Sequence, residues 1–150
     1  TPLNLIYVSH KPEKQFVKAI LNNSKYFDSF IKSPDKGFYS IKYSYKPTLR
    51  GETHVKRLSF NPDFFVKNKN KNELLVVEMK DDSDTSQKNK AKYRDGKNHF
   101  SELNVALFDN GIDWSYYFYF LSPEDIGSFI AAIKENRYKN WKSNLMQDLS

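Results

Sequence analysis

The amino-acid sequence predicts an α/β protein, in which strands and helices pack around a shared core. The first observation is a short, Val-rich apolar run, Leu74–Val77, which lies between polar segments as buried strands do. The second is Ile126–Ile133, where apolar residues recur at the spacing of one helix face. The third is that aromatic side chains make up 16% of the 150 residues, which suits a core packed between strands and helices. We therefore expect residues 1–150 to form a single domain, which is either complete or a fragment of a larger protein.

The first part of the chain predicts a helix and then a strand. Pro12 suits the first turn of a helix and Glu13 suits its positively polarised N-terminus, so a helix is expected over 12–22. Its predicted apolar stripe consists of Phe16, Val17, Ile20 and Leu21. Polar and apolar residues alternate from Phe38 to Tyr45, which predicts a half-buried strand.

Two more strands are expected on either side of a polar turn. Val55–Val66 predicts the first of them, but Pro62 has no N–H to donate to a neighbouring strand. This strand must therefore lie at an edge, carry a bulge or be interrupted at the proline. Asn68–Asn72 is a polar turn, and the buried run that begins at Leu74 follows it, so the two strands should form an antiparallel hairpin.

The second part of the chain predicts a long helix and a strand. The helix is expected from Gln87 to about Phe108, with Thr85 or Ser86 as its cap and a bend at Gly96. Its apolar face is expected to strengthen late, at Phe100, Leu103, Ala106 and Leu107. The strand, 113–121, carries large side chains in every position, so both of its faces should be covered.

Two amphipathic segments are expected after this strand. Ser122 and Pro123 are a typical cap and first residue for the helix whose apolar face ends at Ile133. The final segment, Asn136–Leu149, is expected to bury Tyr138, Trp141, Leu145 and Leu149.

Three ionisable residues should meet at the end of the hairpin. Glu78 and Lys80 lie two residues apart on one strand and therefore share a face, and the turn brings Asp63 back beside Glu78. Two close carboxylates repel each other, unless one is protonated or a divalent cation neutralises both. Oxygen ligands in a chain without Cys favour Mg²⁺, with Mn²⁺ as a substitute.

Pro62-Asp63 followed by Glu78-Met79-Lys80 resembles the signature of the PD-(D/E)xK nuclease superfamily. The resemblance implies a restriction-endonuclease-like αβββαβ core, with a central mixed sheet flanked by helices. Within the superfamily, the apolar residues after Asp63 look most like the nuclease domains of type III restriction enzymes and helicase-associated nucleases. Many of those proteins have Gly where this chain has Asp81, and junction resolvases or transposon-end nucleases remain the other subfamily candidates.

The resemblance also assigns roles to individual residues. It implies that Asp63, Glu78 and Lys80 are catalytic and that the two carboxylates bind Mg²⁺ together with the backbone carbonyl of Met79. A glutamate on the first helix supports the metals in many members, and Glu13 matches it by position; the alternative is a plain partner for the helix dipole.

The helix after the Glu-x-Lys strand often adds a basic or amide residue in these nucleases. Lys90 is the preferred candidate here, with Gln87 and Lys92 as rivals, and a merely solvated lysine-rich surface remains open. The residues expected to contact nucleic acid are Lys88, Lys90, Lys92 and Arg94.

The expected function is that of a Mg²⁺-dependent DNA endonuclease in a restriction, transposition or repair system. The net charge of +6 favours a polyanionic partner, and the absence of Cys fits a reducing cytoplasm. No apolar stretch is long enough to span a membrane. The assembly is left open between a homodimer and a larger helicase–nuclease complex. The alternative function is a non-catalytic module of the same fold that binds nucleic acid or protein.

Overall fold

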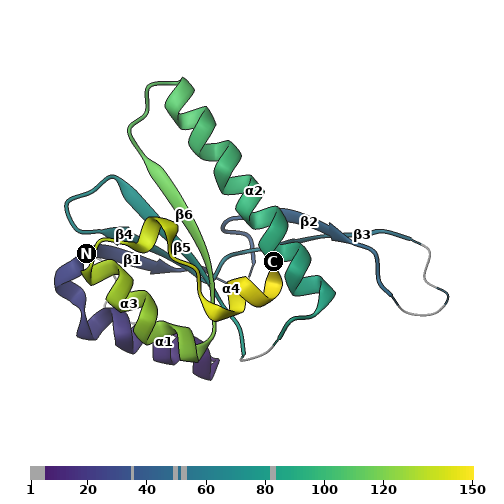
Figure 1. Cartoon of the computed structure of the whole chain (residues 1–150), viewed down its shortest axis with the longest axis horizontal. Helices are drawn as coiled ribbons and strands as arrows, with labels where there is room; N and C mark the ends of the chain where they lie inside the picture. Colours follow the sequence, from purple (N-terminus) through teal and green to yellow (C-terminus); the bar gives the residue numbers. More distant parts are fainter. Residues whose placement is uncertain (1–5, 35, 49–50, 52–53, 82–83) are drawn as a thin grey trace.

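A mixed four-stranded sheet, flanked by helices, forms the body of the molecule, and a two-stranded ribbon projects from it (Figure 1). The computed structural model describes residues 6–34, 36–48, 51, 54–81 and 84–150. The predicted mixed α/β class with helices against a mixed sheet is confirmed.

The sheet has the strand order β1-β4-β5-β6. Its strands are β1 (Phe27–Lys32), β4 (Phe64–Asn68), β5 (Glu73–Met79) and β6 (Ser115–Leu121). β4 pairs antiparallel with both β1 and β5, whereas β6 pairs parallel with β5. Leu75, Val76 and Val77 are fully buried, as predicted, because helices cover both faces of the sheet, whereas Leu74 of the predicted run is half-buried.

α2 (Gln87–Asp109) connects the parallel strands β5 and β6. Ser86 caps it, since the hydroxyl oxygen of Ser86 accepts a hydrogen bond from the Asn89 N–H at 3.2 Å. The helix continues through Gly96, and the bend predicted there stays a prediction. A β-carbon at Gly96 would collide with the ring of Phe118, so the glycine lets α2 pack closely against β6.

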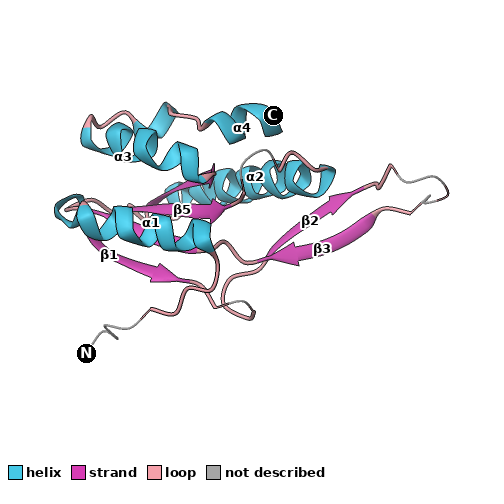
Figure 2. Ribbon diagram, turned by 90° about the horizontal axis from the view of Figure 1, so that it is seen from below, coloured by secondary structure: helices cyan, strands magenta, loops and turns pink. Residues whose placement is uncertain are grey.

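α1 (Lys11–Asn22) and α3 (Ile126–Lys134) cover the other face of the sheet (Figures 1 and 2). The ring of Phe16 on α1 lies 4.8 Å from the ring of Phe64 on β4 and 6.2 Å from that of Phe129 on α3. A short 3-10 turn, η2 (Pro123–Asp125), leads into α3, and the whole predicted apolar stripe of α3 is buried.

Three details of the predicted helices need correction. Leu21 of the expected α1 stripe is 57% exposed. The late part of α2 runs out past the sheet, where Ala106 is exposed and Phe108 is 84% exposed. The last segment is two short elements, η3 (Tyr138–Asn140) and α4 (Asn144–Leu149), although its apolar side chains pack inward as expected, Trp141 only partly.

The assignment of the early strands also changes. β2 (Ile41–Tyr45) pairs only with β3 (Lys56–Phe60), and these two strands form the projecting ribbon instead of joining the sheet. β1, for which no strand is predicted from the sequence, forms one edge of the sheet. The expected strand over 55–66 is interrupted at Pro62, which is one of the three alternatives that the proline predicts, and becomes β3 and β4.

Candidate functional site

The β4–β5 hairpin brings Asp63 and Glu78 to the same end of the sheet. Phe64 on β4 pairs with Val77 on β5, so Asp63, just before Phe64, and Glu78, just after Val77, are the next residues at this end of the hairpin. Asn70, with a φ of 55°, allows the tight turn at the opposite end of the hairpin. The backbone N–H of Met79 donates a hydrogen bond of 2.7 Å to Oδ2 of Asp63, which fixes this carboxyl beside the end of β5.

Lys80 pairs with Glu78, as their spacing on one strand predicts. The Nζ of Lys80 lies 2.9 Å from Oε1 of Glu78, and the N–H of Lys80 donates to the carbonyl of Leu121 at 2.9 Å. Glu78 is only 3% exposed, and its second oxygen, Oε2, has no hydrogen-bond partner within the described part of the chain. A buried carboxylate oxygen without a donor is costly to keep out of water, and a bound cation would satisfy it.

The crowding of charge has a clear effect on Asp63. Burial raises its pKa from the ordinary 3.8 to about 8, and the negative charges of Glu78 and Glu13 act in the same direction. The hydrogen bond from Met79 and the charge of Lys80 oppose this rise without cancelling it. Asp63 is therefore largely protonated at pH 7, and it would ionise once a positive charge arrived beside it.

For the pKa of Lys80, the nearby charges outweigh burial. Burial alone would lower its pKa, but the charge of Glu78, together with the hydrogen bond to that residue and the charge of Asp63, raises it above the ordinary value. The ammonium group is therefore retained at neutral pH, so Lys80 is a donor and a fixed positive charge at this site.

Glu13 reaches the same site from the first turn of α1. It is 7% exposed, and its Oε2 lies 3.4 Å from the Nζ of Lys32 at the end of β1. This oxygen has no hydrogen-bond partner within the described residues. Glu13 is therefore more than a partner for the helix dipole, because it points inward and acts electrostatically on Asp63.

A cavity of 510 Å³ joins these elements. It is lined by His10, Lys11, Pro12, Glu13, Asp63, Met79, Lys80, Asp81 and Asp84. The donors are carboxylates, which suit Mg²⁺ or Mn²⁺. Among the described residues, no three His, Asp or Glu side chains are already gathered as ligands of one ion. The residues nevertheless fit a divalent cation chemically, since both Glu13 and Glu78 keep an unsatisfied oxygen and Asp63 carries a displaceable proton.

Lys92 is the helix residue that the structure places beside the carboxylates. Its Nζ lies 3.9 Å from Oε1 of Glu78 and over the rings of Tyr43 and Phe60, at 5.7 and 5.3 Å from their centroids. Burial, followed by the charge of Lys80, lowers the pKa of Lys92 to about 8. Lys92 is thus the lysine of this site that can exchange a proton near neutral pH.

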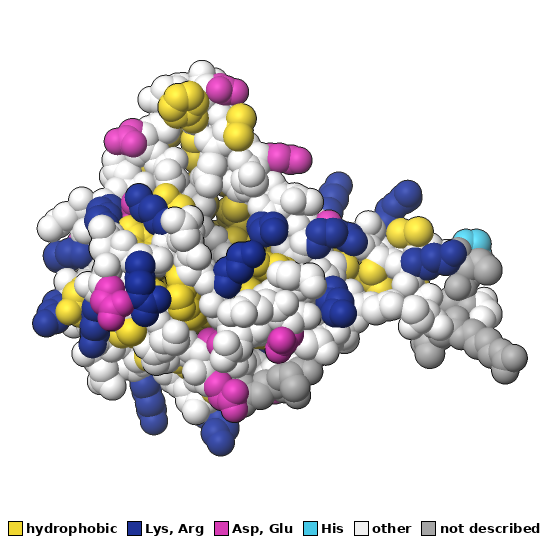
Figure 3. All heavy atoms as spheres, viewed as in Figure 1, with side chains coloured by type: hydrophobic (Ala, Val, Ile, Leu, Met, Phe, Trp, Pro, Cys, Tyr) yellow, Lys and Arg dark blue, Asp and Glu magenta, His cyan; other side chains and the backbone are white. Residues whose placement is uncertain are grey.

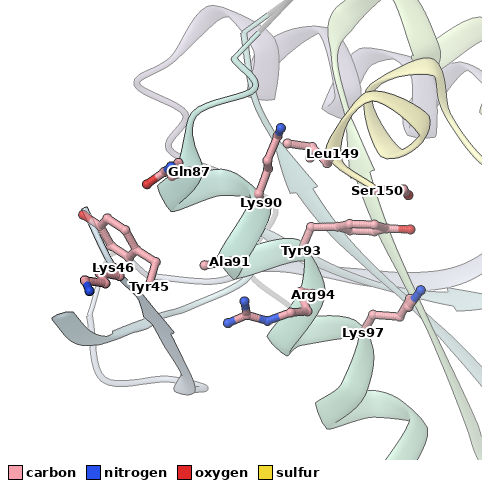
Figure 4. A pocket seen from close by; sticks show the side chains of 10 residues that line it. All are labelled: Tyr45, Lys46, Gln87, Lys90, Ala91, Tyr93, Arg94, Lys97, Leu149 and Ser150. Carbon is pink, nitrogen blue, oxygen red and sulfur yellow. The ribbon is translucent and has the colours of Figure 1, made fainter. Parts of the chain in front are cut away.

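The other predicted α2 residues lie elsewhere. Gln87, Lys90 and Arg94 line a second cavity of 510 Å³, which α2 shares with the end of β2 and with α4 (Figure 4). Arg94 is also held internally, since it donates to both oxygens of Asp95 and to the Ser44 carbonyl. Lys88 is exposed near the start of α2, and its charge contributes to the low pKa of Lys92.

Sequence reasoning missed Lys32 and the two ribbon aromatics that cover Lys92. Lys32 belongs to a strand that local patterns did not reveal, so no sequence signal pointed to its pairing with Glu13. A signal did exist for Lys92, which lies four residues before Gly96, the glycine that packs against β6. The roles predicted for the Met79 carbonyl and for the Lys88–Arg94 cluster on DNA stay predictions.

Comparison of the chain with protein-family models, with curated proteins and with solved structures gave no significant match. Among the described residues, none of the helices combines the length and the apolar character that crossing a membrane requires. The fold and the geometry of this site are therefore the features that indicate a function.

Proposed function

We propose that this chain is a Mg²⁺-dependent DNA endonuclease of the PD-(D/E)xK type. The succession α1, β1, β4, β5, α2 and β6 supports this proposal, because it follows the αβββαβ order that the sequence resemblance implies. The β2–β3 ribbon is then an insertion between the first and second strands of that core.

One observation carries the proposal. Asp63, Glu78 and Lys80 meet at one end of the sheet, with Asp63 bonded to the N–H of Met79 and Lys80 bonded to Glu78. Strand alternation and a hairpin register produce this meeting, and Asp63 and Lys80 line a cavity together with Glu13. Buried groups with strongly shifted pKa values in a cleft are typical of functional sites.

Each residue has a distinct task in the proposed reaction. Asp63 and Glu78 would hold the cation, with Glu13 and the Met79 carbonyl as further donors. The cation, when bound, lowers the pKa of water and offsets negative charge on a phosphate. Lys80 keeps its proton at neutral pH, so it would donate a hydrogen bond to the attacking water or to a phosphate oxygen. The pairing with Glu78 orients its ammonium group before substrate arrives.

The decisive experiment is a plasmid-nicking assay with Mg²⁺, with Mn²⁺ and with EDTA. We expect conversion of supercoiled to nicked or linear DNA with either metal and none with EDTA. Asp63→Asn and Lys80→Gln should each reduce the rate at least about 100-fold. Asp109→Asn, at the exposed end of α2, and Lys18→Gln, on the exposed side of α1, are the matched controls and should cleave normally. Equal cleavage by Asp63→Asn and by its control would refute the proposed site.

The internal ion pairs favour the second candidate function, a nucleic-acid-binding module without turnover. Lys80 neutralises Glu78, Lys32 neutralises Glu13, and Asp63 is neutral by protonation, so the site can be stable without any cation. DNA binding that is equally strong in EDTA, together with no cleavage under either metal, would establish this candidate instead.

A further inference from the structure

The β2–β3 ribbon exposes most of its surface, although it contains two paired strands. The first four residues of β3 are all exposed, and only Phe60, at its base, is buried. The ribbon leaves the body beside α2 and projects beyond it (Figure 1). A ribbon that only completed the core would bury one face along its whole length, so this projecting part is available to a partner.

The ribbon is attached to α2 near the outer end of β2. The N–H of Ser44 on β2 donates to Oδ2 of Asp95 at 3.0 Å, and Nη2 of Arg94 donates to the Ser44 carbonyl at 2.7 Å. These two α2 side chains pair with the free edge of β2 as a neighbouring strand would. Tyr43 and Phe60 pack together at the base, with their ring centroids 5.8 Å apart. The ribbon is therefore held in a fixed direction, which reduces the entropy lost when a partner binds.

The two strands of the ribbon carry charge of a single sign. They contain Lys42, Lys56 and Arg57 and no Asp or Glu, and Lys46 follows β2 directly. Dark blue side chains accordingly line the projecting part in the space-filling view (Figure 3). Lys42 and Arg57 are exposed and form no ion pair with the described carboxylates. Unpaired cations on both strands of an extended ribbon favour a polyanion.

Lys42 and Arg57 act from the same side. Lys42 pairs with Ser59, and Ser44 pairs with Arg57, so these four side chains share one face of the ribbon and the two cations are diagonal neighbours. They line a hollow of 720 Å³ together with Tyr43, Leu58 and Asp95. The charge of Asp95 is already satisfied by Arg94 and by the N–H of Ser44. The hollow thus offers two cations and two hydroxyl groups, which are the side chains that contact phosphate oxygens in DNA complexes.

We propose that the β2–β3 ribbon binds the sugar-phosphate backbone of duplex DNA through Lys42 and Arg57. Two-stranded antiparallel ribbons are narrow enough to lie in the major groove, which places basic side chains against phosphates on its walls. The base of the ribbon contacts Lys92, whose Nζ is 3.9 Å from Glu78. Tyr43 and Phe60 lie on the opposite face of the ribbon from Lys42 and Arg57, so a duplex would contact the face that is turned away from Lys92. This inference rests on the proposed function and adds the surface that would hold the substrate.

The test is fluorescence anisotropy with a short labelled DNA duplex, the full chain and EDTA, so that no cleavage interferes. The variant is Lys42→Gln with Arg57→Gln. The control is Lys25→Gln with Lys134→Gln, which removes the same charge beside Tyr26. Tyr26 lies at the β4–β5 turn, where its carbonyl accepts from the N–H of Lys69, whereas the ribbon joins β4 at the other end. Circular dichroism and thermal melting should show that both variants are folded.

We expect the ribbon variant to bind at least about tenfold more weakly at about 50 mM salt. The slope of log K against log salt should fall by about 0.9 for each lost phosphate contact, and so by about 1.8 for the pair. The control should keep the parent slope. Equal affinities for the two variants would overturn the inference, as would binding of single strands or RNA in preference to the duplex, or binding of an acidic protein with no affinity for DNA.

The failure of the proposed function can be told apart from failure of the ribbon inference. Ribbon-dependent duplex binding by a chain that never cleaves would remove the endonuclease and leave the ribbon surface intact. Metal-dependent cleavage with parent affinity in the ribbon variant would keep the endonuclease and remove the ribbon surface.

Discussion

Replacing Asp63 by Asn should stabilise the metal-free protein, although it removes a residue of the candidate site. Asp63 has a pKa of about 8 in the fold, against 3.8 ordinarily, so ionising this carboxyl is penalised once the pH exceeds the ordinary value. Asn is neutral at every pH, and its Oδ1 can still accept the hydrogen bond from the N–H of Met79.

The magnitude follows from the pKa values. The unfolded chain loses the Asp63 proton near pH 3.8 and the folded chain keeps it to about pH 8. Between these limits the parent loses about 1.4 kcal/mol of unfolding free energy per pH unit relative to Asp63→Asn. The gain of the variant should therefore be small at pH 4, reach up to about 4 kcal/mol at pH 7, and stop growing above about pH 8.

Urea unfolding in EDTA at pH 5, 6 and 7 measures this difference. Asp109→Asn, an exposed carboxylate at the end of α2, should track the parent at every pH. Addition of Mg²⁺ should stabilise the parent much more than Asp63→Asn, because the variant lacks one of the two carboxylates proposed to hold the cation. A destabilised Asp63→Asn variant, or a gain that does not grow with pH, would refute the electrostatic description of this site.

Three further predictions concern the cation, the packing of α2 and the ribbon. Binding of Mg²⁺ should release a proton from Asp63 below about pH 8, so the affinity should rise by up to about tenfold per pH unit between pH 6 and 8; calorimetry in two buffers of different ionisation enthalpy detects this proton, and a pH-independent affinity would contradict the prediction. Gly96→Ala should cost about 1–3 kcal/mol because its β-carbon meets the Phe118 ring, whereas Gly127→Ala in α3 meets nothing within 4 Å and should stabilise by up to about 1 kcal/mol; similar melting temperatures for the two variants would show that α2 packs differently. Asp95→Ala should accelerate amide hydrogen exchange at Ser44, because the Ser44 N–H donates to the Asp95 carboxylate, and should leave exchange in the β4–β5 hairpin unchanged. Unchanged protection of the Ser44 amide would mean that Asp95 does not anchor the ribbon.

The sequence predicted the β4–β5 hairpin because every signal for it is local. A Val-rich run, a polar turn and a proline that interrupts pairing all lie within one short segment, and strand alternation then sets which side chains share a face. β1 was missed because it is an edge strand, whose Asp28 and Ser29 are exposed, and its pairing with β4 spans a long stretch of chain. Local patterns do not record which distant strand a segment joins.

The position of Lys92 shows how rotation of a helix limits such predictions. Lys90 and Lys92 are two residues apart, so they project from nearly opposite sides of α2. Composition cannot choose between them, because lysines surround the first turns of this helix. The packing of α2 determines that Lys92 is the one that faces the site, because Gly96 and Phe100 face the sheet and Lys92 lies one helical turn before Gly96.

The site neutralises its three carboxyl groups in two different ways, which determines how it should respond to a cation. Glu13 is paired with Lys32, Glu78 with Lys80, and Asp63 is neutralised by its own proton. Only the proton can leave without breaking an ion pair, so Asp63 is the carboxyl whose state should change first when a divalent cation enters. Lys80 can stay on Glu78 through that change, because its raised pKa keeps it charged. The proton released on cation binding should therefore come first from Asp63, and a variant that lacks this carboxyl should lose both that proton release and the cation.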